Sequence, residues 1–172
     1  MRAVVVYESM FGNTHHIADA VGTGLAPGFD VTVVPVSRAD PEVLRDADLV
    51  VVGGPTHAHG MSRPVTRRGA AQMTAKPQSG QSLEPEALAP GLREWFAGLG
   101  TYHAKAAAFD TRAAGLAFFT GRASKGVGRA LRRHGFDLAA KPESFLVTGQ
   151  RLGPDEEDRA KAWAAHLASQ LS

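Results

Sequence analysis

Short apolar runs alternate with stretches of helical spacing along most of the chain, and this alternation limits the possible folds more than any other feature. Five of the runs are nearly continuous, which is typical of strands buried on both faces of a sheet. They span residues 3–7, 29–36, 48–55, 104–110 and 144–149. Together with the helical segments that alternate with them, they predict a doubly wound α/β fold: a five-stranded parallel sheet with helices on both faces.

The helical segments have apolar residues every three or four positions and capping signals at their starts. Residues 13–25 follow this spacing, with Asn13 as the expected N-cap. Asp40 and Pro41 have the pattern of an N-cap followed by a first helical residue. Further helices are expected over 63–73, 92–99, 123–131 and 153–171, and a long polar loop over 74–90.

The composition is that of a soluble globular protein and argues against several classes of function. The formal net charge of the 172 residues is only +2, which is too weak to indicate nucleic acid or a membrane as a partner. The chain has no cysteine, which excludes disulfides, thiol catalysis and zinc–thiolate sites. His57 and His59 alone rarely suffice for a metal site, and no apolar run is long enough to span a bilayer. We expect a single cytoplasmic domain over 1–172, without a bound metal.

The turn after the first strand has the composition of an anion site. Ser9, Gly12, Asn13 and Thr14 come just where a helix begins, and there backbone N–H groups and the helix dipole favour negative charge. The turn has no Lys or Arg, so neutral donors would hold a phosphate, a pattern suited to a phosphate monoester. It also lacks the G-x-G-x-x-G of dinucleotide-binding turns, and no P-loop motif occurs in the chain. Ligands of doubly wound sheets bind at the carboxyl ends of strands, so the turns at 56–61 and 110–121 are candidates too.

Three segments resemble the flavin-binding loops of the flavodoxin-like FMN-binding family. "SMFGNT" at 9–14 resembles its phosphate loop, in a form similar to the quinone-reductase-like and flavodiiron branches. "GGPTHAHG" at 53–60 resembles the loop that contacts the flavin ring, and "AFDTR" at 108–112 lies where the third flavin loop is expected. The resemblance covers nearly the whole chain, and it implies FMN as the cofactor and a strand order of 2-1-3-4-5.

The resemblance also implies a role for each matching residue. Ser9, Asn13 and Thr14 would bind the FMN phosphate through their side chains, and Met10, Phe11 and Gly12 through backbone N–H groups. The flavin ring would be lined by Pro55, Thr56, His57, Ala58, His59 and Gly60, with His57 or His59 against it. Asp110, Thr111 and Arg112 would approach the pyrimidine end, where a cation stabilises the anionic reduced flavin.

The resemblance thus implies electron transfer through bound FMN, with a redox partner protein or a small-molecule electron donor or acceptor. Two alternatives stay open: an FMN-dependent NAD(P)H:quinone or flavin reductase-like enzyme, for which no catalytic residue is singled out, and a flavodoxin-fold binding module that retains no FMN. The helix over 123–131 carries a basic face suited either to solvent or to an acidic partner. This face is formed by Arg122, Lys125, Arg129, Arg132 and Arg133.

Overall fold

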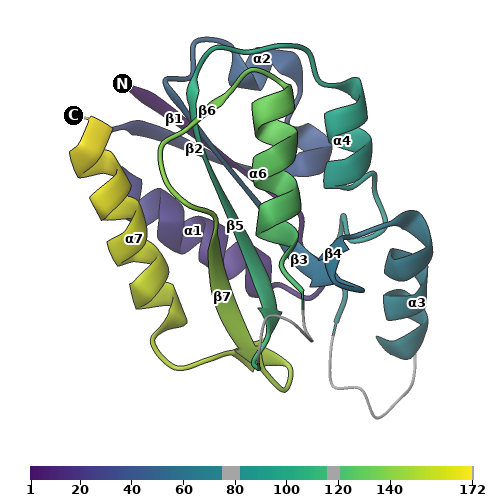
Figure 1. Cartoon of the computed structure of the whole chain (residues 1–172). Helices are drawn as coiled ribbons and strands as arrows, with labels where there is room; N and C mark the ends of the chain where they lie inside the picture. The colour runs from purple at the N-terminus through teal and green to yellow at the C-terminus, as the bar shows by residue number, and fades with distance from the viewer. Residues whose placement is uncertain (75–81, 116–120, 172) are drawn as a thin grey trace.

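The sheet is doubly wound and mostly parallel (Figure 1). The computed structural model describes residues 1–74, 82–115 and 121–171. Five longer strands lie side by side in the order β2 (Asp30–Pro35), β1 (Arg2–Tyr7), β3 (Leu49–His57), β5 (Lys105–Ala113) and β7 (Glu143–Thr148). Neighbouring strands in this series are all parallel. Counted along the chain, the order is 2-1-3-4-5, so the predicted fold is confirmed.

Three two-residue strands extend the sheet beyond the prediction. β4 (Gly60–Met61) folds back antiparallel on β3, and β8 (Arg151–Leu152) folds back antiparallel on β7. β6 (Asp137–Leu138) pairs parallel with β5. The two antiparallel hairpins lie at the carboxyl ends of their long strands, so they shape the edge of the sheet where a ligand is expected.

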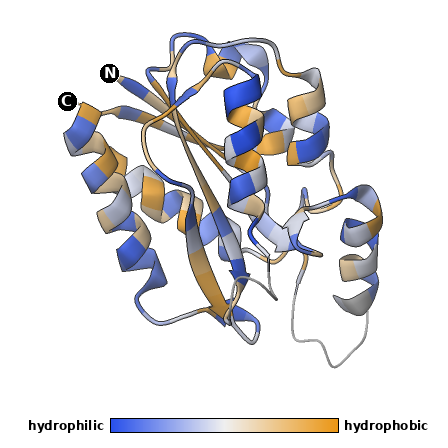
Figure 2. Ribbon diagram, in the orientation of Figure 1, coloured by the Kyte–Doolittle hydropathy of each residue, from blue (hydrophilic) through white to orange (hydrophobic). Residues whose placement is uncertain are grey.

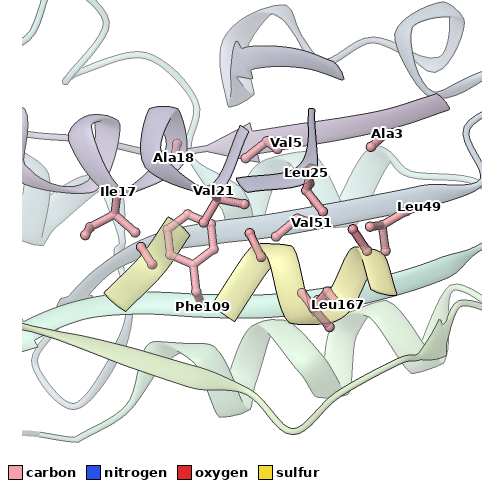
Figure 3. Close-up of a cluster of buried hydrophobic side chains, with 14 of the residues drawn as sticks. Ala3, Val5, Ile17, Ala18, Val21, Leu25, Leu49, Val51, Phe109 and Leu167 are labelled. Carbon is pink, nitrogen blue, oxygen red and sulfur yellow. The ribbon is translucent and has the colours of Figure 1, made fainter. Parts of the chain in front are cut away.

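Helices cover both faces of the sheet, and a separate core lies under each layer. α1 (Asn13–Leu25) and α7 (Glu156–Leu171) pack on one face around Ile17, Phe109 and Leu167 (Figure 3). α2 (Pro41–Leu44), α4 (Leu92–Gly98) and α6 (Ala123–Arg133) pack on the other face, which buries Phe96 and Leu131. Figure 2 shows hydrophobic strands between helices whose outer faces are largely hydrophilic. α3 (Pro64–Thr74) lies at the rim, and the 3-10 turn η1 (Val36–Arg38) follows β2.

Some element boundaries differ from those expected. The N-cap of α1 is Gly12, because Asn13 is already helical. Strand β5 continues past Asp110 because its last residues pair with β7, up to Ala113 opposite Val147. Of the loop expected over 74–90, residues 75–81 lie outside the described part of the chain, as do 116–120 of the expected third flavin loop. The expected N-cap of α2 is confirmed, since the Asp40 carboxylate accepts from the Val43 N–H at 3.0 Å.

Candidate functional site

A pocket of about 330 Å³ lies at the carboxyl ends of β1, β3, β5 and β7. The parallel register brings these four ends to one edge of the sheet, so segments far apart in the chain share one wall. The lining residues are Ser9, Met10, Phe11, Asn13, Thr14, Pro55, Thr56, His57, Thr111, Arg112, Ala113, Val147, Gly149 and Gln150. Most of the residues predicted to bind the cofactor are among them.

The turn between β1 and α1 leaves the start of the helix open to an anion. Gly12 has a left-handed backbone (φ 93°), and its N–H donates to the Ser9 Oγ at 3.1 Å. Among the described residues no side chain caps the start of α1, and its own first turn has no acidic residue, so the first helical N–H groups keep their affinity for negative charge. The left-handed backbone of Gly12 favours glycine, and a Cβ there would lie 3.3 Å from the Glu84 Oε1 at the end of a flexible side chain.

Two side-chain contacts join this turn to the other strand ends. The hydroxyls of Thr14 and Thr111 lie 2.7 Å apart and are buried, which connects the start of α1 to β5. The Asn13 Nδ2 donates to the Gln150 carbonyl at 3.1 Å, which connects α1 to the turn between β7 and β8. Two of the three residues predicted to hold the phosphate through side chains, Asn13 and Thr14, therefore already help to shape the pocket.

At the end of β3, the structure separates the residues that line the pocket from those that only form the turn. Pro55, Thr56 and His57 line the pocket. Ala58 (φ 44°) and His59 (φ 70°) form the exposed turn into β4, so these two and Gly60 lie outside the pocket wall. Burial lowers the pKa of the His57 imidazole, which favours the neutral ring at neutral pH. His57 therefore fits the predicted position against the flavin ring better than His59 does.

Asp110 points away from the pocket. Its Oδ2 accepts from the backbone N–H of Ser124 at 2.7 Å, and Thr56 Oγ1 accepts from that of Ala123 at 3.0 Å. The two side chains together cap α6, whose own N-cap residue makes no side-chain bond. Burial raises the pKa of the Asp110 carboxyl, against the opposing effect of the Ser124 hydrogen bond. Asp110 is therefore not among the residues that line the pocket, because its buried carboxylate is held at the start of α6.

Thr111 and Arg112 line the pocket. The Arg112 side chain is buried, and its Nη1 donates to the Gly115 carbonyl at 2.9 Å. This places a cation beside the pocket while anchoring it to the backbone that follows β5.

Sequence reasoning missed one wall of the pocket, formed by Ala113, Val147, Gly149 and Gln150. Val147, Gly149 and Gln150 lie at the end of the strand expected over 144–149 or directly after it. The carboxyl end of that strand must lie at the same edge of the sheet as the carboxyl ends of the other parallel strands. That strand end is a usable signal, because every parallel strand of a doubly wound sheet contributes its carboxyl end to the ligand edge. Ala113 was missed because β5 is longer than expected.

A second pocket, of about 220 Å³, lies beside the same turn and shares Ser9 with the first. Its wall includes Tyr7 and His15, whose rings stack with centroids 4.5 Å apart. Burial, with the nearby charge of Glu84, raises the Tyr7 pKa to about 12. The phenol therefore stays protonated throughout the physiological range.

The chain belongs to the flavodoxin family, because the flavodoxin family model matches residues 5–163. Solved structures with the same fold include a flavodoxin from the domain Archaea, with a TM-score of 0.67 and 21% identity over 99% of both chains. Oxidised Flavodoxin 1 from Bacillus cereus matches with a TM-score of 0.69 and 16% identity over 100% of both chains. A protein described as a flavodoxin, WrbA-like, from Agrobacterium tumefaciens matches with a TM-score of 0.59 and 17% identity over 99% of this chain and 96% of that one. A search of curated proteins finds no match.

Flavodoxin family proteins bind FMN, and the residues of the larger pocket fit that group. The uncapped start of α1 suits the phosphate, and the walls formed by β3, β5 and β7 combine apolar side chains with Thr56, His57, Thr111 and Arg112, which suits a flat aromatic ring with a polar edge. No described helix is long and apolar enough to cross a membrane. Within residues 1–74, 82–115 and 121–171, no group of three or more His, Cys, Asp or Glu side chains is placed to hold a metal ion.

Proposed function

We propose that this protein transfers electrons through FMN held in the pocket at the carboxyl ends of β1, β3, β5 and β7. FMN, when bound, supplies the redox chemistry, and the protein supplies binding, orientation and charge. The observation that supports this most is the uncapped start of α1, whose own first turn has no acidic residue, beside a pocket lined by three further strand ends. Ser9, Thr14 and the backbone N–H groups of the turn would hold the phosphate, and Pro55, Thr56 and His57 would line the ring.

The test compares FMN with riboflavin, which lacks the phosphate. We expect the purified protein to quench FMN fluorescence on titration. It should bind FMN at least about a hundredfold more tightly than riboflavin, since charge-assisted hydrogen bonds to the phosphate contribute about 1.5–3 kcal/mol each. Ser9→Ala/Thr14→Ala is expected to weaken FMN binding at least about tenfold and to leave riboflavin binding nearly unchanged. The matched control Thr23→Ala/Ser169→Ala removes two hydroxyls that are exposed on α1 and α7.

Equal affinities for the two flavins, or an equal effect of the control variant, would remove the turn from the FMN site. If the protein retains no flavin at all, the binding-module alternative takes its place. NADPH oxidation by the FMN-loaded protein without a partner protein would favour the reductase-like alternative over the electron carrier.

Arg112 is expected to set the relative affinity for reduced and oxidised FMN. A buried cation beside the pocket favours the anionic reduced flavin. Arg112→Gln should therefore lower the affinity for reduced FMN relative to oxidised FMN by roughly tenfold, about 1.4 kcal/mol, and make the flavin potential more negative. Arg112→Lys keeps the charge, so its ratio of affinities for reduced and oxidised FMN should stay close to that of the wild type. The two dissociation constants, measured separately under anaerobic conditions, check this, and an unchanged ratio in Arg112→Gln would exclude the role.

A further inference from the structure

Helix α6 has a continuous basic face toward solvent. Its apolar residues, including Val127 and Leu131, are buried against the sheet. The opposite side exposes Lys125, Arg129, Arg132 and Arg133. The helix has no acidic residue, and none of these four side chains forms an ion pair within the described part of the chain. Figure 2 shows hydrophilic segments repeating along α6.

This basic face begins at the mouth of the FMN pocket. The first N–H of α6 donates to Thr56, which lines the pocket, and Gly121 bridges to His59 in the turn after β3. Arg93 of α4 extends the charge toward β4, because its Nε donates to the Met61 carbonyl at 3.1 Å and Gly126 of α6 lies against the Met61 side chain. We call Arg93, Lys125, Arg129, Arg132 and Arg133 the α6 basic surface.

Acidic side chains elsewhere in the chain offset this charge, so the net charge of +2 conceals a cluster of like charges on α6. The first turn of α7, which carries Glu156, Glu157 and Asp158, packs on the face opposite α6 (Figure 1). Such a distribution orients an approaching charged partner more than it raises affinity, and it changes association rates by about 10- to 1000-fold.

We infer that the α6 basic surface docks an acidic redox partner protein, and so brings that partner to the mouth of the FMN pocket. The inference rests on the proposed function. A protein fits better than a nucleic acid, because α6 has no aromatic side chain on which bases would stack, and because the basic stripe spans only about 12 Å of helix.

The test uses two haem proteins of opposite surface charge as probes: acidic cytochrome b5 and basic cytochrome c. The FMN-loaded protein is reduced with dithionite, the excess reductant is removed, and the oxidation is followed by stopped flow. The reduced flavin loses two electrons, which convert two ferric haems to ferrous, and its protons pass to solvent. We expect the rate with cytochrome b5 to fall as salt is added and the rate with cytochrome c to rise.

Lys125→Glu/Arg129→Glu should lower the rate with cytochrome b5 about tenfold at low salt, raise the rate with cytochrome c, and weaken both salt dependences. The matched control Arg45→Glu/Lys161→Glu makes the same change in net charge at exposed positions away from α6, and it should change either rate less than about threefold. Equal effects of the two variants, or a salt-independent rate for the wild type, would overturn the docking surface.

The flavin content of each protein, read from its visible spectrum before mixing, distinguishes failure of docking from failure of the proposed function. A wild type without FMN overturns both. If the FMN content is normal but the rates with the two cytochromes do not respond to the charge of the α6 basic surface, only the docking surface is overturned. A nucleic acid would become the inferred partner of the α6 basic surface if Lys125→Glu/Arg129→Glu lost affinity for a DNA duplex while its rates with cytochrome b5 stayed unchanged.

Discussion

Glu8→Ala is expected to lower the free energy of unfolding by about 1–3 kcal/mol for each of the two buried donors that it leaves without an acceptor. Glu8 lies directly after β1 and is only 6% exposed. Its Oε1 accepts from the Ser62 hydroxyl, and its Oε2 accepts from the Leu92 N–H at 2.9 Å. The single carboxylate thus joins the end of β1 to the starts of α3 and α4.

Arg67 completes this network from α3. It is 4% exposed, and its Nη1 donates to the Ser62 Oγ at 2.8 Å. Its Nη2 donates to the Glu94 Oε2 at 3.1 Å, and the same oxygen accepts from the Gly91 N–H at 2.8 Å. Removing Glu8 leaves the Leu92 N–H and the Ser62 hydroxyl without an acceptor in a buried setting, while Arg67 keeps its ion pair with Glu94.

Urea unfolding gives the measurement, with the midpoint and slope compared between variants. The control is Glu42→Ala, which removes the acid of an exposed pair with Arg45, the two side chains being 67% and 64% exposed. Exposed pairs contribute about 0–1 kcal/mol. Glu8→Gln keeps the shape of the side chain but not its charge, and its loss of unfolding free energy should fall between those of Glu8→Ala and Glu42→Ala. If Glu8→Ala costs no more than Glu42→Ala, the network does not stabilise the fold.

Gly53→Ala is the second large effect we expect, at about 1–3 kcal/mol or more. Gly53 lies in β3 directly opposite Phe109 of β5, and a Cβ at this position would overlap the Phe109 ring. The ring is fully buried in the core shared with α1 and α7 (Figure 3), so it has nowhere to move. The glycine is needed for space and not for an unusual backbone angle.

A double-mutant cycle separates this clash from a general effect on the strand. Phe109→Ala alone should cost about 3–5 kcal/mol. It also removes the obstacle, so Gly53→Ala/Phe109→Ala should cost about 0.5–3 kcal/mol less than the sum of the single changes. Gly69→Ala is the control, because a Cβ there meets nothing within 4 Å, and in α3 it should stabilise by up to about 1 kcal/mol. Strict additivity of the two core substitutions would contradict the clash.

Both predictions also concern the pocket. Glu8 directly precedes Ser9, and Gly53 opens the segment that leads to Pro55, Thr56 and His57, so each holds a pocket-lining turn in place. Glu8 is not among the residues predicted to bind FMN, and Gly53 enters the sequence prediction only as the first residue of the segment 53–60.

The sequence alone determined the five long strands, the helices that alternate with them, their order along the chain and three of the turns at the ligand edge. The reason is that burial on both faces gives continuous apolar runs, burial on one face gives helical spacing, and parallel strands must end together. These signals are local or follow from topology. They were sufficient to place Ser9, Thr14 and His57 beside one pocket.

The tertiary structure alone decided which side chains meet within that frame. Asp110 caps α6 instead of facing the pocket, Asn13 bonds to Gln150 across 137 positions, and Glu8 joins Ser62 and Leu92. Hydrogen-bonding groups of one kind are interchangeable in a sequence, and the choice among them depends on burial and direction, which exist only once the chain is packed.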